Sequence, residues 1–572
     1  MSNKIKGIGA SDGIALAKAY VLKEEPIVIS NHQTKDPEQE IELMKKALER
    51  AKTDLKNLQQ LALEKLGGEK AAVFEAHAQI LDDPMMSDEI ITLIREKKYN
   101  AARAIKEESD KFAATFDSMD DEYFRERAAD IRDVTDRWLR YVLDLLVIDL
   151  ATIKEEVIIV ANDLTPSQTA QLNPTFVKGF ACNVGGRTSH AAIMARSLEI
   201  PAVLGLKTIT ESVKQGAMIA LDGNSGDVEI EPADASLWDK KAKNYLQMKK
   251  ELNTYKDKTT VSKDGNDKML LEGNIGTPKD VEGVIANGGE GIGLFRSEFL
   301  YMDNDHFPTE DEQFEEYKKV LENMGDKMVV IRTLDIGGDK KLSYFQFPAE
   351  MNPFLGYRAI RFSLDRKDVF KNQIRALLRA SAYGKLGIMF PMIATIDEFK
   401  AAKDFTLEQK KLLEKEGIKV GDNIEIGMMV EIPAAAMNAT NFAKYADFFS
   451  VGTNDLIQYS MAADRMSEKV SYLYQPLNPS ILNLLKLTID GAHKHGKWAG
   501  MCGEMAGDAK AIPLLMGLGL DAFSMSASSI PLARSIIAKL TIKETQELTK
   551  KALELETAEQ VEALVDNLLA SK

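Results

Sequence analysis

One histidine stands in a setting that suits phosphate chemistry. His190 lies in the segment GGRTSHAAIMARS, behind two glycines, an arginine and two hydroxyl side chains. A neutral imidazole is a good nucleophile near pH 7 because its pKa lies close to that value. A phosphoryl group on it would lie near the free N–H groups at the start of a helix through AAIMARS. The supporting residues are expected to be Gly185 and Gly186 in a tight turn, Thr188 or Ser189 as the helix cap, and Arg187 as a nearby cation.

The alternative is a histidine that only caps or packs at a helix start. The neighbouring glycines, hydroxyls and arginine favour phosphate chemistry over that alternative. The remaining histidines lack such neighbours and are interpreted as structural, with one of them, His77, a candidate for a helical contact surface. They are His32, His77, His306, His493 and His495.

A second group of polar residues follows short apolar segments in the C-terminal half. Arginine binds phosphate and carboxylate through two hydrogen bonds, and Mg²⁺ prefers oxygen ligands while keeping part of its water shell. Together these residue types predict a site for a small phosphorylated carboxylate, with Mg²⁺ bound by the carboxylates of Glu431 and Asp455. The residues are Arg296 after GIGLF, Arg332 after MVVI, Glu431 after IGMMV, Asn454 and Asp455 after FFSVGT, Cys502 and Glu504 after WAGM, and Arg358 and Arg465 in other loops.

Each of these residues could instead be a surface charge that follows a strand. The repetition of this pattern at five strand ends favours a common site over that interpretation. Cys502 is less specific, since a buried cysteine usually behaves as a small hydrophobe. From its position alone, an inert core role competes with a catalytic one.

The segments before these residues predict a barrel. After about Gly265, buried-strand candidates alternate with helix-like stretches. This is typical of a (β/α)8 barrel, whose chemistry lies at the C-terminal ends of its strands. The candidates are residues 270–276, 291–295, 328–331, 388–393, 426–430, 448–453, 498–501 and 522–526. The last segment is predicted to be helical, with Thr541 and Thr557 as N-caps.

The N-terminal half has a different pattern. Residues 4–25 and the region after Lys154 carry short strand-like runs, whereas 31–150 shows apolar residues at helical spacing with charges between them. The sequence therefore predicts a multidomain α/β fold. Its expected domains are a small α/β domain of residues 1–30 plus 146–232, an inserted helical domain of 31–145, a linker helix of 233–260 and a TIM barrel of 261–572.

Composition limits the class of protein. The 572 residues are 45% hydrophobic and 28% charged, as in soluble globular proteins of three or four domains. A net charge of −15 argues against a general nucleic-acid binder. Two cysteines form no disulfide framework, and no apolar run has the length of a signal-peptide core or membrane span. We therefore expect a cytoplasmic protein without membrane insertion.

Two motifs resemble those of the Enzyme I family, the phosphoenolpyruvate–protein phosphotransferases of the bacterial sugar phosphotransferase system. GGRTSHAAIMARSLEIPAV (185–203) resembles the family's phosphohistidine motif. DFFSVGTNDLIQYSMAADR (447–465), with EIPAA (431–435), resembles its barrel signature. The resemblance extends from the N-terminus to the last helix and shows no departure at the matched catalytic positions.

The resemblance implies a transfer in two steps. His190 would take the phosphoryl group of phosphoenolpyruvate, releasing pyruvate, and pass it to a histidine of the carrier protein HPr. The inserted helices would dock HPr, and the barrel would form a homodimer. The implied roles are substrate binding for Arg296, Arg332, Arg358, Asn454, Asp455 and Arg465, Mg²⁺ binding for Glu431 and Asp455, and protonation of the pyruvate enolate for Cys502.

The separation of these residues along the chain implies motion. His190 and the barrel residues lie in different predicted domains. Residues 1–230 are therefore expected to swing about the linker near 233–258.

Other classes of protein are the alternatives. Pyruvate phosphate dikinase and phosphoenolpyruvate synthase share the motifs but need an ATP-binding domain, for which the helical region before residue 150 offers no room. The nitrogen-regulatory relative of Enzyme I likewise needs an extra sensory domain. A Mg²⁺-dependent barrel lyase would leave GGRTSH without a role. A non-catalytic binding protein would not need the full set of charged strand ends.

Overall fold

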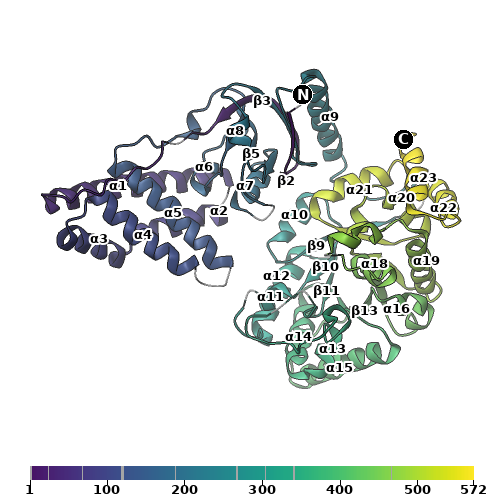
Figure 1. Ribbon diagram of the computed structural model, residues 1–572. Coiled ribbons are helices and arrows are strands. Elements are labelled where there is room, and N and C mark those ends of the chain that lie inside the picture. Colours follow the sequence, from purple (N-terminus) through teal and green to yellow (C-terminus); the bar gives the residue numbers. More distant parts are fainter. Residues whose placement is uncertain are drawn as a thin grey trace. The chain divides into compact units, whose positions relative to one another are not determined.

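The computed structural model describes residues 3–23, 25–66, 68–117, 122–186, 189–265, 268–302, 304–338, 340, 342–465 and 467–572. The chain divides into two compact units, residues 1–248 and residues 249–572. Figure 1 shows a sheet with helices in the first unit and a ring of strands surrounded by helices in the second.

A mixed sheet forms the core of the first unit. Its strands follow the order β1-β8-β7-β3-β4-β5-β6-β2. β3 to β6 pair in parallel, and the flanking strands pair antiparallel. The strands are β1 (Asn3–Lys6), β2 (Ile8–Ser11), β3 (Ile14–Val21), β4 (Val157–Ala161), β5 (Val177–Cys182), β6 (Ala202–Leu204), β7 (Met218–Asp222) and β8 (Asp227–Ile230). Short helices beside the sheet are η1 (Leu150–Thr152), α6 (Pro166–Thr169), α7 (His190–Ser197) and α8 (Ile209–Ser212).

A set of long helices is inserted in the sequence between β3 and β4, which are neighbouring strands of this sheet. β3 pairs directly with β4, with Lys18 opposite Val157, although more than a hundred residues separate them in sequence. The helices are α1 (Pro37–Leu66), α2 (Gly68–Leu81), α3 (Pro84–Lys97), α4 (Ala101–Asp117) and α5 (Glu122–Val142). Their apolar faces share one core that includes Ile90, Ile105 and Trp138, as amphipathic helices require.

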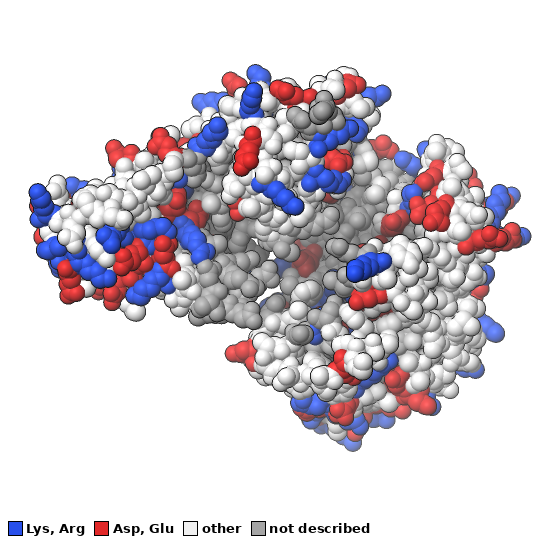
Figure 2. All heavy atoms as spheres, viewed as in Figure 1, with Lys and Arg blue, Asp and Glu red and all other residues white. Residues whose placement is uncertain are grey.

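The surface of these helices carries charges of both signs. Figure 2 shows basic and acidic side chains intermixed at the end that bears α1 and α3. Examples are the ion pairs of Arg95 with Glu38, at 2.9 Å, and of Lys52 with Asp82, at 2.6 Å. Exposed pairs of this kind stabilise little, and they leave a mixed rather than a strongly basic surface.

His77 is structural, as interpreted from the sequence, but it does not lie on a contact surface. Its side chain is fully buried in the helical core, where Nε2 lies 3.1 Å from Oδ1 of Asp130 and the ring packs edge-on against Phe74. Sequence spacing places a residue on a helix face, but the packing of the neighbouring helices decides whether that face reaches solvent.

A long helix, α9 (Ala235–Asn253), follows the sheet of the first unit. Trp238 is buried near its start, and its indole N–H donates to Glu229 Oε2 at 2.9 Å. The rest of the helix is mostly exposed, including Leu246. The helix runs across the point at which the chain passes from the first unit to the second.

Eight parallel strands close a barrel in the described part of the second unit, in the order β9 to β16. The strands are β9 (Leu270–Ile275), β10 (Ile292–Arg296), β11 (Met328–Arg332), β12 (Lys385–Phe390), β13 (Ile424–Val430), β14 (Phe448–Val451), β15 (Trp498–Met501) and β16 (Ala522–Met525). Each of the eight overlaps a strand that the sequence predicts, with the largest shift at β12, which begins three residues before the predicted segment 388–393. The multidomain α/β fold with a TIM barrel is therefore confirmed.

Helices surround the barrel and connect its strands (Figure 1). The α-helices are α10 (Asp280–Ala286), α11 (Phe299–Met302), α12 (Glu310–Met324), α13 (Ile360–Asp365), α14 (Lys367–Ala380), α15 (Ile396–Lys415), α16 (Pro433–Met437), α17 (Ala439–Phe442), α18 (Thr453–Met461), α19 (Pro479–His493), α20 (Ala511–Leu518), α21 (Ile530–Ile537), α22 (Ile542–Ala552) and α23 (Ala558–Ala570). The 3-10 helices are η2 (Pro353–Leu355), η3 (Ser381–Tyr383), η4 (Glu468–Leu473), η5 (Glu504–Gly507) and η6 (Ala527–Ser529).

The two C-terminal helices begin at the predicted caps. Thr541 and Thr557 each form a capping box, with Glu544 and Gln560 respectively. None of the helices that the structure describes is long and apolar enough to span a membrane.

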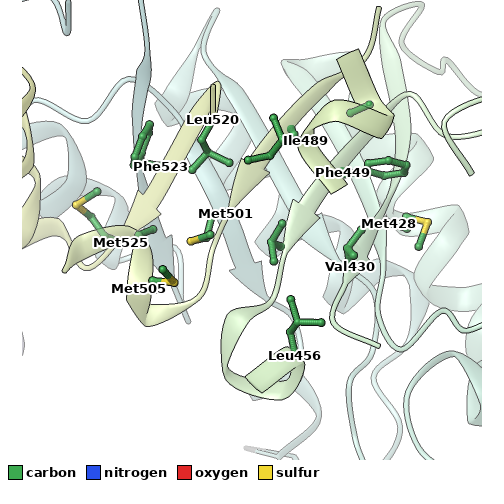
Figure 3. Close-up of a cluster of buried hydrophobic side chains, with 14 of the residues drawn as sticks. Met428, Val430, Phe449, Leu456, Ile489, Met501, Met505, Leu520, Phe523 and Met525 are labelled. Atoms are coloured by element: carbon green, nitrogen blue, oxygen red, sulfur yellow. The ribbon is translucent and has the colours of Figure 1, made fainter. Parts of the chain in front are cut away.

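Alternation along each strand divides the barrel into two cores. On β13, Met429 faces the barrel interior, where it packs with Val330 and Phe448. Its neighbours Met428 and Val430 face outward (Figure 3), into the larger core formed with the helices. Successive side chains of a strand point to opposite faces, so the inward position at each strand end is set by this alternation.

Candidate active site

The inward alternation carries several predicted residues to the mouth of the barrel. Arg296 lies two positions after the inward Leu294, and Arg332 lies two positions after the inward Val330. Glu431 likewise follows Met429. Side chains two positions apart on a strand share a face, so all three point toward the barrel axis at the carboxyl ends of the strands.

These side chains line a single cavity of about 570 Å³. Every barrel residue predicted to bind substrate or metal or to donate a proton belongs to its wall, although the residues come from loops after several strands. They are Arg296, Arg332, Arg358, Glu431, Asn454, Asp455, Arg465 and Cys502.

The arginines fall into two kinds by their partners. Arg332 and Arg358 are buried and paired with carboxylates: Arg332 contacts Glu298 closely, and Arg358 Nη2 lies 3.6 Å from Asp455 Oδ2. Burial lowers their pKa values, but the neighbouring carboxylates more than offset this and raise both above the ordinary value. Within the part of the chain that the structure describes, Arg296 and Arg465 have no ion pair to a carboxylate.

The two carboxylates predicted to bind metal are both buried at the cavity wall. Glu431 is 1% exposed, and its Oε1 accepts from the Met392 N–H at 2.6 Å. Burial, with the charges of Asp455 and Asp335, raises the pKa of Glu431 to about 8. Asp455 Oδ1 is buried without a hydrogen-bond partner among the described residues.

A carboxylate pair with unused oxygen atoms fits a hard cation. Mg²⁺ is held in many sites by one or two carboxylates, with water and substrate oxygens completing its shell. The described residues contain no group of three or more His, Cys, Asp or Glu side chains arranged as a metal site. The donor set of Glu431 and Asp455 therefore fits Mg²⁺ that shares its coordination with a bound anion.

Asn454 and Cys502 also line the cavity. Asn454 Oδ1 accepts from Tyr474 OH at 3.2 Å and from the Glu504 N–H at 3.4 Å. Cys502 directly follows β15 and is 4% exposed, and its carbonyl accepts from Asn274 Nδ2 at 3.0 Å. Burial raises the pKa of the Cys502 thiol.

The histidine motif lies in the first unit, between β5 and α7. Helix α7 begins at His190, with Ser189 as N-cap; Ser189 Oγ accepts from the Ala192 N–H at 3.4 Å and donates to the Gly186 carbonyl at 2.9 Å. Gly185 has a φ of +103°, which glycine adopts without strain. Arg187, Thr188 and the side chain of His190 lie outside the described residues.

Sequence reasoning missed several residues of the cavity wall. Glu298, Asp335, Lys340 and Tyr474 all line it. A signal was available for three of them, because they continue the polar segments RSE and RTLDIGGDK beyond the ends of β10 and β11. Tyr474 offers no such signal, since it lies far along the chain from any strand end.

The fold and the cavity define a two-unit α/β protein whose barrel carries a cavity lined by charged side chains of both signs. Comparison with known proteins identifies the class more closely. The family model described as PEP-utilising enzyme, PEP-binding domain, matches residues 249–542. Models for the N-terminal and mobile domains of PEP-utilising enzymes match residues 6–127 and 153–226.

Full-length relatives agree with these matches. A phosphoenolpyruvate-protein phosphotransferase of Mycoplasma capricolum is 60% identical and covers 100% of this chain and 99% of its own. One of Listeria monocytogenes is 54% identical and covers 100% of both.

A solution structure of an Enzyme I protein (nEIt) is 39% identical and covers 42% of this chain and 99% of its own, with a TM-score of 0.39.

The chain therefore belongs to the phosphoenolpyruvate-protein phosphotransferases, transferases within the PEP-utilising enzymes. The resemblance inferred from the two motifs is confirmed.

Proposed function

We propose that the barrel cavity binds phosphoenolpyruvate and that His190 accepts its phosphoryl group, which then passes to a histidine of the carrier protein HPr. The observation that carries the proposal is that four arginines converge on one cavity with the carboxylates of Glu431 and Asp455, the amide of Asn454 and the thiol of Cys502. A trianionic substrate needs several cations, and the phosphoryl group in transfer needs them most.

The residues suggest a division of labour in the first step. An imidazole nitrogen of His190 attacks phosphorus, the N–P bond forms, and the bond from phosphorus to the enolate oxygen breaks. Arg296 and Arg465, which lack carboxylate partners in the described chain, are available to bind the substrate's anionic groups. The thiol of Cys502 then gives its proton to C3 of the enolate, which becomes pyruvate.

Mg²⁺ is the cofactor that we propose for this step. Glu431 and Asp455 would hold it, and the cation would neutralise charge on the phosphoryl oxygens. The supporting observations are the burial of both carboxylates and the unpartnered Asp455 Oδ1.

The proposed reaction also implies roles for the other parts of the chain. We propose residues 31–145 as the HPr-docking domain, 1–30 with 146–232 as the phosphohistidine domain, 233–260 as the linker, and 261–572 as the substrate-binding domain and the homodimer interface. A cytoplasmic location is consistent with two cysteines that are both free thiols.

The test is intact-mass spectrometry of the pure protein after addition of phosphoenolpyruvate and Mg²⁺ without ATP. We expect a gain of one phosphoryl mass that is acid-labile and base-stable, as a phosphohistidine is. His190→Ala should show no gain, and the exposed barrel histidine variant His495→Ala should label like the unmodified protein. Addition of HPr should then remove the label.

The contrary results point elsewhere. No gain in folded protein would contradict the role of His190. Labelling that requires ATP would favour the dikinase class, and labelling of His190→Ala would place the phosphoryl group on another residue.

A further inference from the structure

Two buried carboxylates hold three of the cavity's cations in place. Asp335 Oδ1 accepts from Arg358 Nη2 at 2.9 Å, while its Oδ2 lies 3.0 Å from Arg332 Nη1 and 3.2 Å from Lys340 Nζ. Glu298 Oε1 accepts from Lys340 Nζ at 2.7 Å and also contacts Arg332 Nη2. Asp335 is thus the one carboxylate among the described residues that contacts all three cations.

This arrangement is buried. Asp335 is 1% exposed, and Arg358 is 2% exposed. Burial alone would raise the pKa of Asp335, but Arg332, Arg358 and Lys340 together lower it well below its usual range. The Asp335 carboxyl group therefore stays charged. Removing its negative charge would leave the three cations facing one another in a buried site.

The backbone also ties Asp335 to Arg358. Gly337 follows two positions after Asp335 with a φ of +110°, and a Cβ there would lie 2.5 Å from Arg358 Cβ. The Ala359 N–H donates to the Ile336 carbonyl at 3.0 Å. The segments 335–337 and 358–359 therefore lie directly against each other, and the Asp335 carboxylate binds the Arg358 side chain across this contact.

The partners of Arg358 account for both of its terminal nitrogens. Nη1 donates to Tyr459 OH at 3.2 Å, and Nη2 binds Asp335. The Nε atoms of Arg332 and Arg358 are buried without a hydrogen-bond partner in the described chain. Protein groups therefore hold both guanidinium groups, and Asp335 is the carboxylate that contacts the two of them.

We propose that Asp335 is a positioning residue for phosphoryl transfer. One oxygen of Asp335 accepts a hydrogen bond from Arg358 and the other forms an ion pair with Arg332. Asp335 thereby fixes the separation of the two guanidinium groups before substrate arrives, so that little reorganisation is needed when the substrate binds and transfer begins. This inference rests on the proposed function of the cavity.

The test compares Asp335→Asn, Asp335→Glu and the control Asp368→Asn, an exposed aspartate paired with Arg366 at 2.7 Å. The rate of His190 phosphorylation is measured against phosphoenolpyruvate concentration. A hydrogen bond between charged groups is worth enough to shift binding about 10- to 100-fold. We expect Asp335→Asn to raise KM by that factor, Asp335→Glu to recover part of the loss, and Asp368→Asn to change nothing.

A double-mutant cycle distinguishes positioning from a general effect. Asp335→Asn is combined with Arg358→Lys, and the change in kcat/KM is compared with the product of the single changes. If Asp335 acts through Arg358, the double variant should lose less than that product. Multiplicative losses, or an unchanged KM in folded Asp335→Asn, would overturn the proposal.

Two measurements keep the outcomes separate. Circular dichroism and thermal unfolding report whether each variant folds; if Asp335→Asn does not, Asp335→Glu with Arg358→Lys serves in the same cycle and is judged by the same criterion. Absence of labelling in the unmodified protein would defeat the proposed function instead.

Discussion

Burial gives the thiol of Cys502 a defined protonation state. The residue directly follows β15, and its side chain packs with the residues of the barrel interior and lines the charged cavity. Because burial raises the pKa of this thiol, the group keeps its proton at neutral pH. A protonated thiol beside the cavity is suited to donating to a carbanion-like centre.

Replacement of Cys502 by alanine should slow pyruvate formation by about 100-fold or more, which is the usual contribution of a general acid. The measurement is pyruvate released during turnover with HPr. Since the thiol pKa is raised, the unmodified protein should keep this step through neutral pH and lose it only on the alkaline side.

The second cysteine provides the control for this prediction. Cys182 is buried in β5, in the core of the first unit. Cys182→Ala is expected to leave the rate of pyruvate release unchanged. A Cys502→Ala protein that releases pyruvate at the normal rate would remove Cys502 from the reaction.

Among the elements, the loop before α7 depends most on backbone conformation. Its two glycines differ: Gly185 has a positive φ and a Cβ there would lie 3.2 Å from Leu204 Cδ1, whereas a Cβ on Gly186 would meet nothing within 4 Å. Only the first position therefore requires glycine for conformational reasons. Ser189 then begins the helix, as expected of an N-cap.

Gly185→Ala should destabilise the first unit by about 1–3 kcal/mol, because alanine at this φ is strained. Gly186→Ala should change stability by less than about 0.5 kcal/mol, as substitutions at open surface positions usually do. Thermal unfolding of the two variants gives the comparison. Equal losses of stability would mean that the loop does not keep this conformation.

At the scale of the whole molecule, the chain separates the histidine motif from the cavity. His190 belongs to the unit of residues 1–248, and the cavity belongs to the unit of residues 249–572. Helix α9 is the segment that connects them. If His190 is loaded in the cavity and unloaded on HPr, the first unit has to move about this connection.

Small-angle X-ray scattering should therefore change when phosphoenolpyruvate and Mg²⁺ are added. Asp455→Asn, which weakens the proposed metal site, is the control and should show little change. The same profile with and without substrate, in protein that still becomes phosphorylated, would contradict a swing of the first unit.

The strands and the residues that follow them could be predicted from the sequence. Apolar runs of strand length recur through the second unit, and each places the next inward residue by simple alternation, as Leu294 places Arg296 and Met429 places Glu431. Local rules of this kind act over a few residues, so the sequence displays them directly. The caps at Ser189, Thr541 and Thr557 are local in the same sense.

The pairing of charges could not be predicted in this way. Which cation meets Asp335, whether Arg358 faces solvent or a carboxylate, and whether His77 reaches the surface all depend on how distant loops and helices pack. Contacts between segments far apart in sequence leave no periodic signal in either of them. The amino-acid sequence was enough to place the chemical groups at the mouth of a barrel, whereas folding in three dimensions selected their partners, because burial makes the free energy of a charge depend on its neighbours.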